Sequence, residues 1–312
     1  MELPVREASG VYTIAVTPFH DDGRLDDDSA ERMVEFYRRC GISGMTILGV
    51  MGEATKLDTA EAVGFSRRVI AAAADLPVIV GVSAPGFAAM RALARSVMDA
   101  GAAGVMIAPP ASVRTDDQVV GYYAQAVEAI GGDVPFVIQD YPYGTGVVMS
   151  VPAIRRVVEA HASCFMLKHE EWPGLEKLGA VRSLMQEGAM RRVSVLTGNG
   201  GIFLDFELER GADGAMTGYA FPEMLVDLVR LQKAGEREAA HDLFDAHLPL
   251  LRYEQQPGPG LAVRKLILKQ RGAILSDAQR KPASALSPTA RAEVAYLLAR
   301  LARRDPRAKG LG

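Results

Sequence analysis

The sequence is poor in cysteine and in long apolar runs. Its two cysteines, Cys40 and Cys164, are far apart and lack metal-ligand spacing, so neither a disulfide framework nor a zinc site is expected. The five histidines show no pairing at metal spacing, and no cofactor is expected. No apolar run approaches the roughly 18 residues that a membrane-spanning helix needs, and the N-terminus lacks the pattern of a secretory signal. These absences favour a soluble protein of the reducing cytoplasm.

The sequence also lacks a strong excess of charge of either sign. Lys and Arg number 35 against 38 Asp and Glu, and the only basic stretch is the short tail "RLARRDPRAK". We therefore expect no nucleic-acid partner and no membrane-surface partner. With 312 residues, of which 49% are hydrophobic, the chain can bury a large core, and one large domain with an appendage is the expected organisation.

Short apolar runs alternate with longer helix-patterned stretches over most of the chain. The runs are continuous rather than alternating, as in parallel strands that are buried on both faces. Eight such βα units predict a closed (β/α)₈ TIM barrel over residues 1–233. An open doubly wound sheet is the alternative, but "VTPFHDDG" after the first strand is no GxGxxG turn. The predicted strands are 11–16, 44–49, 76–82, 103–110, 134–140, 164–169, 193–198 and 214–218.

Beyond residue 234 the strand pattern stops. Three helical stretches remain, at 236–254, 260–273 and 287–304, and proline-rich joints separate them. They predict a C-terminal helical domain, 234–312, that covers the barrel or an oligomer contact.

Polar residues gather where the predicted strands end. In a barrel of this kind the active site lies at the carboxyl ends of the strands, so these residues should converge on one rim. They are Thr17, Gly49, Val50, Met51, Gly52, Glu53, Pro109, Pro110, Gln139 to Tyr143, Lys168, Gly198, Asn199, Thr217 and Gly218.

Lys168 stands out because it ends the apolar run "CFML", where an unpaired charge is costly. From its position alone two interpretations stay open. One is an ordinary surface ion pair with Glu170 or Glu171. The other is a desolvated amine that attacks a ketone and forms a Schiff base, whose iminium stabilises a carbanion at the adjacent carbon.

Three features together resemble the dihydrodipicolinate synthase / N-acetylneuraminate lyase family of Schiff-base aldolases and dehydratases. The stretch "GVMGEATKL" is similar to the family pattern G-[TS]-T-G-E-x-x-x-L, "VTPF" is similar to the family's first strand, and Lys168 matches the lysine at the end of its sixth strand. The resemblance spans nearly the whole chain. It implies a Schiff base between Lys168 and a small-molecule 2-keto acid, no cofactor, and a homo-oligomer, in this family a tetramer.

The loop 49–53 is the predicted carboxylate site. Its glycines at 49 and 52 would let backbone N–H groups, including those of Val50 and Met51, point at the carboxylate of a 2-keto acid. The resemblance implies a structural role for Glu53, which would accept hydrogen bonds from the loop beneath the site; a simple helix-start acid is the alternative. Thr17 is assigned to the same support, and Thr217 and Gly218 to substrate binding.

The sequence departs from the family pattern at positions that matter for chemistry. Val50 and Met51 replace two threonines of the carboxylate loop. "QDYPYGTG" replaces Y-N-x-P-x-x-[TS]-G, which puts Gln139 at the catalytic tyrosine and Gly144 at the arginine that holds a second carboxylate. These losses count against the lysine-pathway synthase. The "QD-x-P" form resembles the sugar-acid branch, particularly 2-keto-3-deoxyarabonate dehydratase-like proteins.

Tyr141 is the predicted replacement for the missing acid/base, although a packed loop aromatic is the alternative. In an extended chain the Tyr141 side chain would face the same way as that of Gln139, a predicted substrate-binding residue. We expect Tyr143 to face the opposite way. Tyr143 and His169 are weaker candidates. The predicted function is dehydration or retro-aldol cleavage of a 2-keto-3-deoxy sugar acid. The alternatives are 4-hydroxy-tetrahydrodipicolinate synthase, which condenses pyruvate with aspartate semialdehyde, and a catalytically silent keto-acid-binding barrel.

Overall fold

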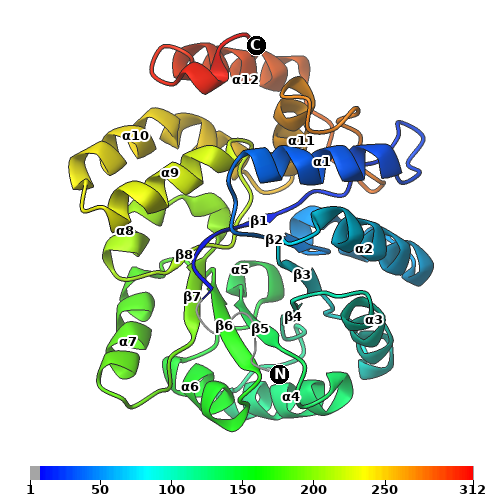
Figure 1. Ribbon diagram of the computed structural model, residues 1–312, viewed down its shortest axis with the longest axis vertical. Coiled ribbons are helices and arrows are strands. Elements are labelled where there is room, and N and C mark those ends of the chain that lie inside the picture. Colours follow the sequence, from blue (N-terminus) through cyan, green and yellow to red (C-terminus); the bar gives the residue numbers. More distant parts are fainter. Residues whose placement is uncertain (1–7, 312) are drawn as a thin grey trace.

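The computed structural model describes residues 8–311, in which eight parallel strands close into a barrel (Figure 1). Each strand pairs with the next, and β1 pairs with β8. The predicted (β/α)₈ barrel is thus confirmed, although several strands end before the predicted residue. The strands are β1 Gly10–Ile14, β2 Gly44–Ile47, β3 Val78–Gly81, β4 Gly104–Ile107, β5 Phe136–Asp140, β6 Cys164–His169, β7 Ser194–Thr197 and β8 Gly214–Ala215.

Helices follow the strands and surround the barrel (Figure 1). Several begin at side-chain caps: Asp26 accepts a hydrogen bond from the Ser29 N–H, and Asp58 and Glu61 form a capping box. The helices are α1 Asp27–Arg39, α2 Thr59–Ala73, α3 Phe87–Asp99, α4 Asp116–Ile130, α6 Val151–Ala160, α7 Leu175–Gln186, α8 Leu204–Glu209 and α9 Pro222–Lys233. Shorter turns in the strand-to-helix loops are η1 Val50–Gly52, η2 Ala54–Lys56, α5 Pro142–Thr145 and η3 Asn199–Gly201.

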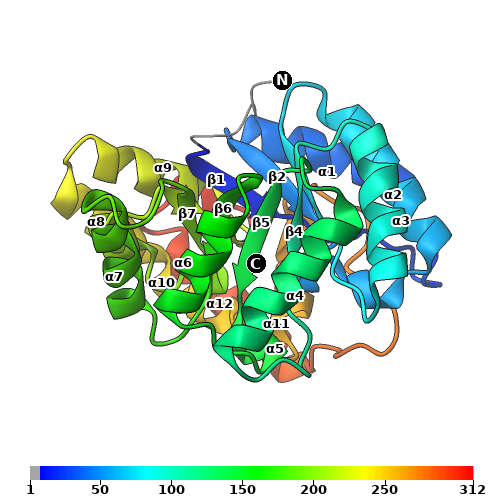
Figure 2. The ribbon, with the colours of Figure 1, turned by 90° about the horizontal axis from the view of Figure 1, so that it is seen from below.

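Three further helices, α10 Arg237–Glu254, α11 Gly260–Gln270 and α12 Pro288–Leu301, form the predicted C-terminal extension, and a short turn, η4 Pro306–Ala308, follows. Figure 2 shows α11 at the same end of the barrel as α5, which follows the carboxyl end of β5. The extension therefore adds walls to the predicted functional rim. The domain boundary at residue 234 stays a prediction. Within residues 8–311 we find no helix with the length and apolar character needed to cross a bilayer.

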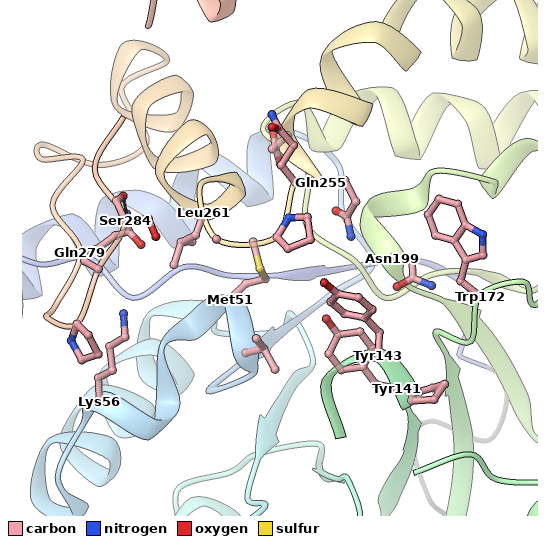
Figure 3. A pocket seen from close by; sticks show the side chains of 18 of the residues that line it. Met51, Lys56, Tyr141, Tyr143, Trp172, Asn199, Gln255, Leu261, Gln279 and Ser284 are labelled. Carbon is pink, nitrogen blue, oxygen red and sulfur yellow. Dashed lines mark hydrogen bonds between the residues drawn. The ribbon is translucent and has the colours of Figure 1, made fainter. Parts of the chain in front are cut away.

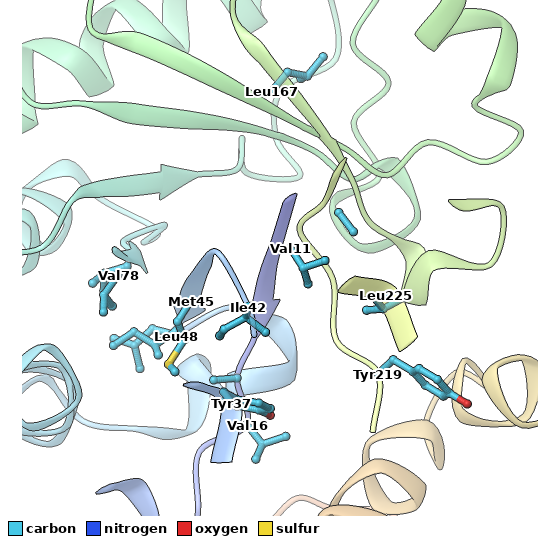
Figure 4. Packing of buried hydrophobic residues seen from close by; sticks show 14 of the residues in the cluster. Val11, Val16, Tyr37, Ile42, Met45, Leu48, Val78, Leu167, Tyr219 and Leu225 are labelled. Carbon is cyan, nitrogen blue, oxygen red and sulfur yellow. The ribbon is translucent and has the colours of Figure 1, made fainter. Parts of the chain in front are cut away.

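Two apolar layers pack against the strands. The larger one fills the space between strands and helices, and Figure 4 shows part of it, including Val11, Met45 and Leu167. The smaller one fills the barrel interior and includes Val137 of β5 and Met166 of β6. Side chains alternate along a strand, so two residues after this pair the chain again directs side chains inward. Those side chains belong to Gln139 and Lys168, which are register partners.

Candidate functional site

Lys168 forms a buried ion pair. Its side chain lies at the end of β6 with 4% of the residue exposed, and its Nζ lies 2.7 Å from Oε1 of Glu170, which is also buried. Of the two interpretations that the sequence left open, the pairing with Glu170 is present, but it lies in the barrel mouth and not on the surface. An unpaired ammonium at this depth would be strongly destabilising, and Glu170 compensates it.

Glu170 is the centre of a small polar cluster. Its Oε1 also accepts a hydrogen bond of 2.8 Å from Nε2 of Gln139. The Asn199 side chain donates to the Glu170 carbonyl oxygen at 2.7 Å. A side chain at Gly198 would overlap the Glu170 side chain, so the glycine leaves room for the carboxylate. Gln139, which stands where the family pattern has tyrosine, therefore helps to hold a carboxylate against Lys168.

Our sequence interpretation considered Glu170 only as a surface partner of Lys168. The signal that could have identified it is its spacing, because a residue two positions after Lys168 faces the same side of an extended chain. The carbonyl of Asp140 accepts a hydrogen bond from the Glu170 N–H, so the β5–β6 ladder continues to this residue.

A cavity of about 870 Å³ opens at this end of the barrel (Figure 3). Its wall comes from the loops of the barrel and from the segments before and after α11. Lys168 and Gln139 do not line it; Glu170 connects them to Asn199 on its wall. Its volume is within the range of small-molecule sites. The residues labelled in Figure 3 are Met51, Lys56, Tyr141, Tyr143, Trp172, Asn199, Gln255, Leu261, Gln279 and Ser284.

Tyr141 and Tyr143 both reach the cavity. Figure 3 shows their rings between Met51 on one side and Trp172 on the other, and the ring centroids are 6.3 Å apart. The expectation that Tyr143 faces away is wrong. Side chains two residues apart face the same way in an extended chain, and here β5 ends at Asp140 and the chain turns into α5 after Tyr141. The two differ in burial: Tyr143 is 70% exposed, whereas Tyr141 is partly buried.

Burial raises the pKa of Tyr141 to about 12, and the negative charge of Glu170 contributes. The phenol is therefore protonated near neutral pH. It is suited to donate a hydrogen bond and is a poor base.

Gly144 lies against the Tyr141 ring. A side chain at residue 144 would overlap the ring carbons of Tyr141, so a residue larger than glycine requires the ring to move. The partly buried position of Tyr141 and the absence of an arginine at 144 are thus linked by packing.

The loop 49–53 folds into the turn η1. The Gly52 N–H donates to the Gly49 carbonyl at 3.0 Å, so it is used within the turn. Val50 and Met51 line the cavity, and no acceptor for their N–H groups is found within residues 8–311. Thr17 packs beneath the loop and donates through Oγ1 to the Gly52 carbonyl at 2.5 Å.

Glu53 is buried and ties the loop to the C-terminal helices. Its Oε1 lies 2.7 Å from Nζ of Lys265 in α11, and its Oε2 accepts from Nζ of Lys56 at 2.9 Å and from the Arg280 N–H at 3.1 Å. Lys265 also donates to the Thr17 carbonyl at 2.8 Å. The partners of Glu53 are therefore mainly lysines and a distant segment, whereas we expected N–H groups of its own loop.

Thr217 and Gly218 are buried after β8 and do not line the cavity. The Thr217 carbonyl accepts a hydrogen bond from the Ile14 N–H at 2.9 Å, and Gly218 lies against the guanidinium of buried Arg264. Both residues thus contribute to barrel closure between β8 and β1.

His169 faces away from the cavity. Its Nδ1 lies 3.2 Å from Oδ2 of Asp140, and its Nε2 lies 2.9 Å from the Gly174 carbonyl, on the helix side of β6. Burial lowers the pKa of His169, but the hydrogen bond and charge of Asp140 outweigh burial, and the pKa is raised. Lys177 also contacts Asp140, at 2.7 Å. This cluster lies behind the strand that carries Lys168, so His169 is not part of the site.

The chain is similar to known proteins over nearly its whole length. Residues 7–301 match the model of the dihydrodipicolinate synthetase family. The L-2-keto-3-deoxyarabonate dehydratase of Azospirillum brasilense is 30% identical over 94% of both chains. The 4-hydroxy-tetrahydrodipicolinate synthase of Sorangium cellulosum is 29% identical over 97% of this chain and 99% of its own. The crystal structure of a dihydrodipicolinate synthase from Rhodopseudomonas palustris is 62% identical with a TM-score of 0.93, over 95% of this chain and 98% of that one.

Proposed function

The chain belongs to the dihydrodipicolinate synthetase family of lyases, and we propose that its Lys168 forms a Schiff base with a 2-keto acid. The observation that supports the proposal best is the buried Lys168–Glu170 pair at the end of β6, beside a cavity of small-molecule size. A lysine amine at this depth, with a carboxylate in contact, can attack a ketone and exchange protons with its neighbour.

The proposed substrate is a 2-keto-3-deoxy sugar acid. The relative from Azospirillum brasilense that carries such a name supports this choice. The cavity supports it too, because within the described residues 8–311 its wall has no arginine for a second carboxylate, and it has neutral amides that suit hydroxyl groups. These amides are Asn199, Gln255, Gln256 and Gln279.

In the proposed reaction Nζ of Lys168 attacks C2 of the substrate, and the carbonyl oxygen leaves as water. Removal of a C3 proton from the iminium gives an enamine, which expels the C4 hydroxyl as water; in the aldolase variant, cleavage of the C3–C4 bond gives the enamine. The Val50 and Met51 N–H groups of the 49–52 loop hold the carboxylate, and the Tyr141 hydroxyl donates a hydrogen bond to the departing oxygen. Gln139 holds Glu170 beside Lys168, and Thr217 and Gly218, which do not line the cavity, support the site through closure of the barrel.

Turnover of a panel of 2-keto-3-deoxy acids tests the proposed substrate class. Each acid is incubated with the enzyme, and the loss of the keto acid is followed by NMR together with the appearance of a dehydrated product or of pyruvate. Dehydration or cleavage of at least one sugar acid is expected. A failure with the whole panel, under conditions where pyruvate still reacts with Lys168, would contradict the substrate class and leave the Schiff base standing. If no sugar acid is turned over and pyruvate does not react with Lys168 either, a catalytically silent keto-acid-binding barrel is favoured.

The second candidate is 4-hydroxy-tetrahydrodipicolinate synthase. The 62% identical structure from Rhodopseudomonas palustris bears the name dihydrodipicolinate synthase, which favours it. Against it stand Gly144, which provides no guanidinium, and the Tyr141 ring, which fills the space beside residue 144.

We expect the condensation of pyruvate with aspartate semialdehyde to proceed at less than about 1 per second. The reason is that the second substrate's carboxylate lacks a bidentate partner at residue 144. A coupled assay with the next enzyme of the synthase reaction measures the rate. A rate typical of enzymes would show that this chain is a synthase.

Replacement of Tyr141 by phenylalanine should lower turnover of the sugar acid by about a hundredfold, the effect of losing one donor to a developing negative charge. Tyr143→Phe is the matched control, since this tyrosine also lines the cavity but is far more exposed; its effect should stay below about tenfold. Steady-state turnover rates of the two variants show which tyrosine donates the hydrogen bond. The reverse order of effects would assign the donor to Tyr143.

The family also supports an assembly proposal. We propose a homo-oligomer, a tetramer by family resemblance, in a reducing cytoplasm that keeps Cys40 and Cys164 as thiols.

A further inference from the structure

We propose that Glu170 is the general base of this site: it relays the protons of Schiff-base formation and removes the proton from C3 of the bound keto acid. This inference rests on the proposed Schiff base at Lys168. It assigns the proton transfer to a carboxylate on the same strand end as the lysine, in place of the phenol that the family pattern has at residue 139.

The position of Glu170 fits this role. Its Oε1 lies 2.7 Å from Nζ of Lys168, the atom that becomes the iminium nitrogen. C3 of the substrate is only two bonds from that nitrogen, through C2, so a carboxylate that contacts Nζ lies beside C3 once the bond to C2 has formed. Geometry of this kind is the first requirement for a general base.

The surroundings of Glu170 hold its carboxylate in this position. Gln139 donates to Oε1 at 2.8 Å, and the backbone N–H of Asn199 lies 3.4 Å from Oε2. The absence of a side chain at Gly198 makes the position possible, since a Cβ there would overlap the carboxylate. Gln139, Gly198 and Asn199 thus all help to place one acidic side chain, which we would not expect of a chance ion pair.

Other titratable groups near Lys168 are less suited. The Tyr141 phenol, with its pKa raised to about 12, is a weak base near neutral pH. His169 faces the helix side of β6. Glu171 forms an ion pair with Lys177. Glu53 forms ion pairs with Lys265 and Lys56. Glu170 is the carboxylate whose partner is the reacting amine itself.

The proton transfers balance with Glu170 as the single relay. Glu170 takes a proton from the Lys168 ammonium, the amine attacks C2, and the carbonyl oxygen receives that proton. A second proton passes from the nitrogen through Glu170 to the same oxygen, which leaves as water and gives the iminium. Glu170, again a carboxylate, then takes the C3 proton to form the enamine. It returns this proton to the C4 hydroxyl, which departs as water as the C3–C4 double bond forms. Water then adds to C2 of the remaining iminium, and cleavage of the C2–N bond releases the keto acid and regenerates the Lys168 amine.

An exchange experiment with pyruvate in D₂O distinguishes removal of the C3 proton from Schiff-base formation. With Glu170→Gln, exchange of the pyruvate methyl protons, followed by NMR, should fall by at least about a hundredfold relative to wild type, whereas borohydride should still trap pyruvate on Lys168, more slowly. The control is Glu176→Gln, which removes an exposed carboxylate from α7 and should exchange like wild type.

Glu170→Ala provides a second readout, because added formate can occupy the space of the missing carboxylate. Formate should restore methyl exchange in Glu170→Ala in a concentration-dependent way and should leave the wild-type rate unchanged. Near-wild-type exchange by Glu170→Gln, or variants that trap pyruvate but gain nothing from formate, would overturn the assignment. A wild-type enzyme that does not trap pyruvate at all would instead refute the proposed function on which it rests.

Discussion

Lys168→Ala is expected to lower the turnover of a 2-keto-3-deoxy acid by at least about 10⁴-fold and to abolish methyl exchange with pyruvate. The alanine variant lacks the amine that becomes the iminium, and no other lysine occupies the strand end beneath the cavity within residues 8–311. Lys56, which does line the cavity, is engaged with Glu53 and the Arg280 carbonyl. Steady-state rates and exchange rates, measured on enzyme whose fold is checked by circular dichroism, give the result.

Two control variants separate covalent chemistry from charge. Lys168→Arg keeps a cation beside Glu170 but cannot form an imine, so its loss should equal that of Lys168→Ala. Lys177→Met removes a lysine of α7 that contacts Asp140 on the helix side of the barrel. This variant should retain turnover within about tenfold of wild type. Activity of Lys168→Arg near that of wild type would show that the charge, and not a covalent bond, is what the reaction needs.

The second large effect is expected in stability. Glu53→Ala should lower the free energy of unfolding by about 3–5 kcal/mol, since it leaves the ammonium of Lys265 buried with only carbonyl oxygens as partners. Equilibrium denaturation measures the change. Glu31→Ala breaks an exposed pair with Arg68 and serves as the control; it should change stability by less than about 1 kcal/mol.

A double variant identifies the cause of that loss. If the unpaired Lys265 charge is responsible, Glu53→Ala combined with Lys265→Met should be more stable than the sum of the two single changes predicts. Simple additivity would mean that the bonds from Lys56 and the Arg280 N–H, and not the buried pair, account for the loss.

The sequence predicted the barrel because each strand is a short continuous apolar run, a local pattern that parallel strands buried on both faces require. The polar residues and glycines after most of these runs indicated a rim of functional residues, and their roles stay predictions. The sequence pattern overestimated the length of β1 and β8, which end at Ile14 and Ala215 although the chain remains buried beyond both residues. Apolar residues in a sequence indicate that a segment is buried, but they do not indicate which of its residues pair with a neighbouring strand.

What the sequence did not predict depends on contacts between distant segments or on local turns. Glu53 meets Lys265 across 212 residues, and no local pattern indicates that pairing. The expected direction of Tyr143 was wrong for two reasons. Residues 141 and 143 face the same side of an extended chain, and a proline after Tyr141 starts the turn α5, so the strand does not continue to residue 143. Glu170 was undervalued because two adjacent glutamates after a lysine resemble an ordinary solvated stretch, and only the fold shows one of them buried against Lys168.

The proposed function depends on a covalent bond between a keto acid and Lys168, and borohydride reduction in the presence of pyruvate detects this bond. The reduced adduct should appear as one added pyruvyl mass on the intact chain, and peptide mapping should place it on Lys168 of the β6 peptide. An adduct on another lysine, or an unmodified chain after reduction with saturating pyruvate, would show that Lys168 does not form this bond.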